Sequence, residues 1–151
     1  MAIRKHDGST PYSIHPVWCA MTILAEEKLP RNIRELGAEV LLNHDVPEDT
    51  TEEIPDYVSE EGKVLISEMI FADSADEMQR IWTRSKLTIL FKLYDKVSNW
   101  LDSTTYFKKQ GAKYYYDRLD YLVKLTDFAE ENFGNLNIVI MARAIEKERR
   151  K

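Results

Sequence analysis

Residues 43–50 have the sequence Asn-His-Asp-Val-Pro-Glu-Asp-Thr, directly after the apolar run Ala38 to Leu42. An imidazole and several carboxylates therefore follow residues that belong in a core. The charged pair His44-Asp45 is expected to be partly buried there, and buried charge needs a partner. We interpret this segment as the centre of a metal site, to which the rest of the chain brings His15 and Asp95.

Apolar residues recur at helical spacing along most of the chain. They predict six helices, over about residues 15–28, 31–45, 55–71, 76–101, 112–133 and 136–147. Residues 103–109 are expected to be a link, and Gly134 is expected to be a C-cap. No alternating strand pattern is present, so the sequence predicts an all-α, single-domain fold over residues 1–151.

The end of the second helix matters most for the site. Pro47 disfavours helical geometry at Val46, so this helix should stop near His44 and Asp45. Neighbouring residues inside a helix point about 100° apart, so both can reach one ion only where a helix end makes room. Glu48 and Asp49 should then fall in a tight turn.

Charge and composition narrow the function classes. The net charge of −5 argues against nucleic-acid binding, which needs a basic face. The chain has one cysteine, Cys19, which lies on an apolar helical face. A single cysteine excludes an internal disulfide, and this fits a reducing compartment. No long apolar stretch and no signal peptide pattern are present, so we expect a cytoplasmic protein with no membrane partner.

Four side chains are the candidate metal ligands: His15, His44, Asp45 and Asp95. Two imidazoles and two carboxylates suit Mn²⁺, Fe²⁺ or Zn²⁺, and the share of oxygen favours a harder ion that keeps bound water. Such an ion gives hydroxide near neutral pH and polarises a phosphoryl oxygen. The set therefore predicts metal-dependent hydrolysis of a phosphate compound.

Further polar residues supply the rest of the expected chemistry. Glu48 and Asp49 are carboxylates beside the metal set, suited to handling the attacking water and the leaving-group proton. Four basic residues could neutralise phosphate charge: Arg4, Lys5, Lys92 and Lys96. Lys92, Asp95 and Asn99 share one face of an otherwise apolar helix.

Each of these residues also has a structural interpretation. His15 precedes a proline at a helix start, a common structural position. Asp95 could have no role beyond a surface ion pair with Lys92 or Lys96. Glu48 and Asp49 could simply cap the third helix, and Arg4 and Lys5 could simply be solvated. Two further groups are expected to pack in or over the core: Met21, Met69 and Met78, and the run Tyr114 to Tyr116.

Three blocks of the sequence occur in an order that is similar to a known family. They are Arg-Lys-His-Asp-Gly-Ser-Thr-Pro-Tyr-Ser-Ile-His-Pro at 4–16, Leu-Leu-Asn-His-Asp-Val-Pro-Glu-Asp-Thr at 41–50 and Lys-Leu-Tyr-Asp-Lys-Val-Ser-Asn at 92–99. The chain resembles the HD-domain metal-dependent phosphohydrolases, most closely the guanosine tetraphosphate (ppGpp) hydrolase domain of the RelA/SpoT group and its small stand-alone relatives.

The resemblance implies a role for each matched residue. The metal ligands would be His15, His44, Asp45 and Asp95, and the pair that handles water and protons would be Glu48 and Asp49. Residues on the substrate side would be Arg4, Lys5, Tyr12 and Asn99. The family's ion is usually Mn²⁺, which we therefore expect ahead of Fe²⁺, Zn²⁺ and Mg²⁺.

The implied function is that of a phosphohydrolase with an HD-domain fold. A metal-bound hydroxide would cleave phosphate or pyrophosphate from a nucleotide, ppGpp-like or another phosphorylated metabolite. The sequence departs from the family at residues 71–85, which lack the Thr- and Lys-bearing stretch that relatives place near the nucleotide. The alternative function is a catalytically silent helical module that binds a nucleotide or a protein partner through the same cleft. The oligomeric state stays open.

Overall fold

The computed structural model describes residues 3–4 and 8–151, with the side chains of 48 and 49 outside that description. Within these residues the regular secondary structure is helical apart from one isolated β-bridge between Ile3 and Pro11. The helices are α1 (Ile14–Leu24), α2 (Arg31–Asn43), α3 (Val46–Asp49), α4 (Glu60–Glu68), α5 (Ser74–Arg80), the 3-10 turn η1 (Ile81–Thr83), α6 (Lys86–Asp102), α7 (Thr104–Lys109), α8 (Ala112–Phe133) and α9 (Asn137–Arg149).

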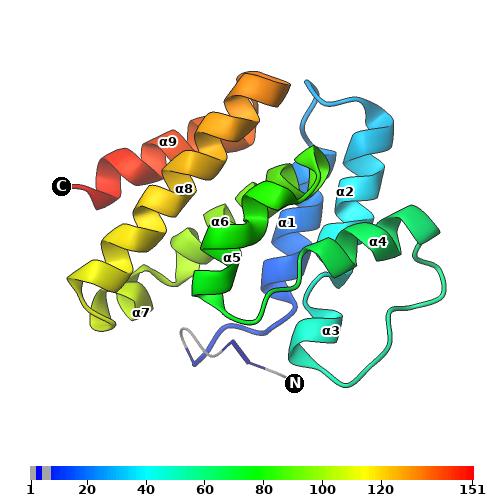
Figure 1. The fold of residues 1–151 in the computed structure, drawn as a ribbon, viewed down its shortest axis with the longest axis horizontal. Helices are drawn as coiled ribbons and strands as arrows, with labels where there is room; N and C mark the ends of the chain where they lie inside the picture. Colours follow the sequence, from blue (N-terminus) through cyan, green and yellow to red (C-terminus); the bar gives the residue numbers. More distant parts are fainter. Residues whose placement is uncertain (1–2, 5–7) are drawn as a thin grey trace.

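Helix α6 is the centre of the fold. Helices α1 and α2 pack on one side of it and α8 and α9 on the other (Figure 1). Its side chains Leu90, Phe91, Tyr94 and Val97 have no exposed surface. Because α6 is covered on several sides, even its polar residue Asp95 is buried, which places a carboxylate in the interior.

A glycine allows the two helices that carry the histidines to approach each other and α6. A Cβ at Gly37 of α2 would collide with the Ile23 side chain of α1 and would lie 2.9 Å from Cε1 of Phe91 in α6. Glycine inside a helix costs stability relative to alanine. Here the absence of a side chain at Gly37 allows closer packing of the helices that carry the candidate site.

The all-α prediction is confirmed, and several helix boundaries agree closely. Helix α8 covers the expected residues 112–133, and Gly134 follows it with a φ of 91°, in the left-handed region. Helix α2 ends at Asn43, so His44 and Asp45 lie at a helix end as expected. Residues 46–49, expected to belong to a tight turn, form the one-turn helix α3.

Other boundaries were wrong, because side-chain caps start helices where apolar spacing gave no signal. The third helix begins at Glu60, after Ser59 accepts a hydrogen bond from the Gly62 N–H. The expected helix over 76–101 is broken, because Ser85 caps α6 by accepting from the Thr88 N–H. Residues 104–109, expected to be a link, form α7.

No helix in the described part of the chain combines the length and apolarity needed to cross a bilayer.

Candidate metal centre

The four candidate ligands converge from separate elements. His15 lies in the first turn of α1, His44 and Asp45 lie between α2 and α3, and Asp95 lies in the middle of α6. Nε2 of His15 is 2.9 Å from Oδ1 of Asp95, and Nε2 of His44 is 3.5 Å from the same oxygen. The two histidines and Asp95 are buried and offer ligand atoms within 4.8 Å of one another.

Asp45 completes the arrangement. Its Oδ1 is 3.1 Å from Nε2 of His44, and its Oδ2 is 3.6 Å from Nε2 of His15. The Asp45 side chain keeps 15% of its surface exposed, against 1% for His44. Asp45 is therefore the most exposed of the four candidate ligands.

The outward-facing nitrogen of each imidazole has a partner. Nδ1 of His15 is 2.8 Å from Oγ of Ser98, and Nδ1 of His44 is 2.6 Å from the carbonyl oxygen of Leu41. A proton on Nδ1 of His44 would be donated to that carbonyl, leaving Nε2 with a lone pair directed at the cluster. This support resembles the way proteins orient metal-binding histidines.

Nε2 of His44 is buried and makes no hydrogen bond of acceptable geometry. A buried nitrogen of this kind needs either a proton shared with a carboxylate or a metal ion. Burial opposes a charge on His44, but Asp45 and Asp95 outweigh burial and raise the pKa of His44 to about 9. A divalent cation, which suits two imidazole nitrogens and carboxylate oxygens, would have to displace that proton from His44.

The two oxygens of Asp95 face different surroundings. Oδ1 faces the histidines, whereas Oδ2 lies 3.2 Å from Nζ of Lys96 and 3.5 Å from Nζ of Lys92. Burial alone would raise the pKa of Asp95, but Lys96, Lys92 and the two neighbouring histidines hold it well below its usual value. Asp95 is thus kept anionic, as a metal ligand must be.

Both lysines share a second carboxylate, Glu77 of α5. Its Oε1 is 3.1 Å from Nζ of Lys92, and its Oε2 is 3.1 Å from Nζ of Lys96. Burial would raise the pKa of Glu77, but the two ammonium groups lower it. With neutral imidazoles, three carboxylates face two lysines, so the cluster has one excess negative charge. The carboxylates are Asp45, Asp95 and Glu77.

Arg4 lies at the edge of this network. Its guanidinium donates to Oδ1 of Asn99 at 2.6 Å and pairs with Oδ2 of Asp102 at 2.6 Å. The amide of Asn99 lies 3.5 Å from Oδ1 of Asp95. Only 8% of Arg4 is exposed, so the expectation that it could be solvated is wrong. The described contacts hold Arg4 in an ion pair.

A polar and aromatic pocket of about 100 Å³ adjoins the lysine side of the cluster. Lys96 and Asn99 of α6 line it, facing α5 and α8. The other lining residues are Ser74, Glu77, Met78, Trp100, Phe107, Tyr114, Arg118 and Tyr121. Residues 92–99 of α6 thus serve the candidate metal centre and the pocket beside it.

The remaining predicted residues divide into two groups. Tyr12 is half-buried in the turn before α1. The backbone of Glu48 and Asp49 lies in α3, directly after Asp45. Their side chains, and the whole of Lys5, lie outside the described residues, so their proposed roles stay predictions. The alternative that Asp95 only pairs on the surface is wrong, because Asp95 is buried.

Sequence reasoning missed three residues of the network: Glu77, Ser98 and Asp102. Ser98 and Asp102 follow Asp95 by one and two helical turns, so helical spacing places them on the same face of α6. That signal was available. Glu77 carried no such signal. The expected helix over 76–101 did not include the break between α5 and α6, and this break places Glu77 against Lys92 and Lys96.

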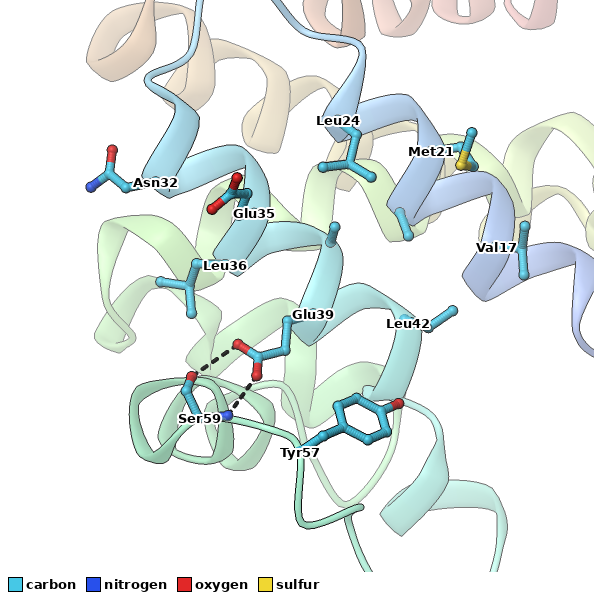
Figure 2. A pocket seen from close by; sticks show the side chains of 12 residues that line it. Val17, Met21, Leu24, Asn32, Glu35, Leu36, Glu39, Leu42, Tyr57 and Ser59 are labelled. Atoms are coloured by element: carbon cyan, nitrogen blue, oxygen red, sulfur yellow. Dashed lines mark hydrogen bonds between the residues drawn. The ribbon is translucent and has the colours of Figure 1, made fainter.

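A larger open groove lies elsewhere, on the outer face of α1 and α2 (Figure 2). Val17, Met21, Leu24, Leu42 and Tyr57 line it, and none of the candidate ligands does. Met21 is 63% exposed, so the expectation that it fills the core is wrong. Tyr115 does pack as expected, since it is buried and its hydroxyl donates to the carbonyl of Arg149.

Comparison of the chain with protein-family models, curated proteins and solved structures gives no match in any of the three.

Proposed function

We propose that this protein is a metal-dependent phosphohydrolase of the HD-domain type, acting on a nucleotide or a related phosphorylated metabolite. The main support is the convergence of Nε2 of His15 and Nε2 of His44 on one buried oxygen of Asp95. The order of the three sequence blocks supports the same proposal independently. The proposed ion is Mn²⁺, with Fe²⁺, Zn²⁺ and Mg²⁺ as the other ions to test.

The proposed ligands are His15, His44, Asp45 and Asp95. When bound, a divalent cation supplies a water of lowered pKa and polarises a phosphoryl oxygen. Ser98 and the Leu41 carbonyl hold the imidazoles in the orientation that directs Nε2 inward. With neutral imidazoles and a dication in place, the cluster carries a net positive charge, which favours an anionic substrate.

The chain's other residues would bind the substrate and move protons. Lys96 lies between the metal cluster and the pocket, where an ammonium group stabilises phosphate charge. Asn99 faces the same pocket. Glu48 and Asp49 follow Asp45 along the chain, and we assign them to the attacking water and the leaving oxygen. Tyr12, Arg4, Lys5 and Lys92 complete the proposed substrate side.

The test is a hydrolysis screen of phosphorylated compounds, including ppGpp, NADPH and nucleoside phosphates. Each compound is incubated with purified protein and Mn²⁺, with and without a chelator. Release of phosphate or pyrophosphate that the chelator abolishes is the expected result. Binding of metal and nucleotide with no turnover of any compound would instead favour the catalytically silent module.

A further inference from the structure

Helix α5 contributes one buried residue, and that residue is charged. Glu77 is 8% exposed and lies between the ammonium groups of Lys92 and Lys96, each 3.1 Å from one of its oxygens. Both lysines come from α6 and also face Asp95. A carboxylate therefore occupies a position at which two cations converge, next to the candidate metal centre.

A further cation lines the same pocket. Arg118 of α8 lies over the Tyr114 ring, 3.1 Å from its centroid, and Nη1 donates to the Tyr114 carbonyl at 3.4 Å. Among the side chains that the structure describes, no carboxylate forms an ion pair with Arg118. Burial removes part of the water around the Arg118 guanidinium and thereby lowers its pKa.

The pocket size limits what can enter. Its volume is about 100 Å³. Since a dry cavity of ~150 Å³ holds a benzene ring, this pocket suits a phosphate-sized group and not an entire nucleoside. The cations around it, Lys96 and Arg118, select a group with negative charge. Asn99 adds a polar amide to the wall.

We propose that Lys96 and Arg118 form a binding site for a phosphate group of the substrate, and that the Glu77 carboxylate, held by Lys92 and Lys96, fills this site until the substrate displaces it. Helix α5 suits such a displacement because it is short and Glu77 is the residue it buries. A phosphate dianion compensates the cations better than one carboxylate. This inference rests on the proposed function and assigns the substrate side of that site.

The test measures inorganic phosphate binding to the metal-free protein by isothermal titration calorimetry, at constant ionic strength and with a chelator present. Glu77→Gln keeps the size of the side chain and removes the competing charge. We expect it to bind phosphate about tenfold more tightly than the wild type, since removing one nearby like charge changes binding on that scale. Adding Arg118→Gln to Glu77→Gln should cancel the gain.

Glu26→Gln is the matched control. Glu26 is also a buried carboxylate, but it accepts from the backbone N–H groups of Lys28 and Asn137, away from the pocket. Its substitution should leave phosphate affinity unchanged. A folded Glu77→Gln protein that binds phosphate no more tightly than the wild type overturns the proposal. So does a gain that persists when Arg118→Gln is added.

A second arm decides the case if Glu77→Gln does not fold. Phosphate should raise the Tm of the wild type, and Arg118→Gln alone should abolish that rise. An equal rise in both proteins overturns the proposal. Because these measurements use no metal and no turnover, they separate the two ideas: phosphate binding as expected without any hydrolysis would refute only the proposed function.

Discussion

Nε2 of His15 lies 2.9 Å from Oδ1 of Asp95, although the two residues come from α1 and α6. The other oxygen of Asp95 faces Lys92 and Lys96. One carboxylate therefore joins two environments, a set of metal-binding donors and a set of cations. Under the proposed function, this division would let α6 contribute both to the metal centre and to the binding of a phosphate group.

Asp45→Ala should abolish both metal binding and turnover. Asp45 is the most exposed of the four proposed ligands, and its loss removes one of two carboxylate charges that would attract a dication. We expect Mn²⁺ affinity to fall at least about 100-fold, more than for loss of an outer partner. Metal content after dialysis and hydrolysis rate are the measurements. Asp120→Ala, which removes a surface partner of Arg150, should change neither.

Glu48→Ala should separate metal binding from turnover. If Glu48 handles the attacking water, its loss should reduce kcat by about 100-fold or more while most of the bound ion remains. Rapid kinetics and metal analysis on the same sample provide both values. Full activity in this variant would show that the acid–base assignment is wrong while leaving the metal ligands unaffected.

Ser98→Ala should weaken metal binding without removing a ligand. Ser98 Oγ lies 2.8 Å from Nδ1 of His15 and fixes the ring orientation. Loss of such a partner reduces metal affinity by about 10- to 100-fold. Competition with a chelator of known affinity measures the change. Thr126→Ala removes a buried hydroxyl whose partner is the Leu122 carbonyl in α8, and metal affinity should stay unchanged.

Gly37→Ala should destabilise the fold. The added methyl group would collide with Ile23 and press on Phe91, and part of that cost is offset by the better helix propensity of alanine. A net loss of about 1–2 kcal/mol is expected from urea unfolding. Because α1 and α2 would move apart, metal affinity should also fall. Glu35→Ala, on the exposed part of α2, should alter stability little.

The stability of the protein should depend on Glu77 in acid. Burial opposes ionisation of Glu77, but Lys96 and Lys92 prevail and lower its pKa below the ordinary 4.5. A lowered folded pKa contributes stability above pH 4.5 that is lost as the pH falls through the folded value. The difference in unfolding free energy between the wild type and Glu77→Gln should therefore shrink below that pH. A difference independent of pH would contradict the ion pairs.

The sequence alone determined the helical class and several helix ends. Apolar spacing defined α8, and Gly134 ended it, because glycine adopts a positive φ without strain. The segment before Pro47 indicated a helix end at His44. These features depend on local backbone preferences and on periodic burial, which a linear sequence contains.

Only the tertiary structure decided how the residues of the candidate centre meet. The packing of α1 and α2 against α6 brings His15 and His44 to the same oxygen of Asp95. The chain breaks between α5 and α6, where Ser85 caps α6, and this break places Glu77 against Lys92 and Lys96. Such contacts join residues far apart in the chain, and their geometry depends on the packing of side chains such as Ile23 and Phe91, which helical spacing does not specify.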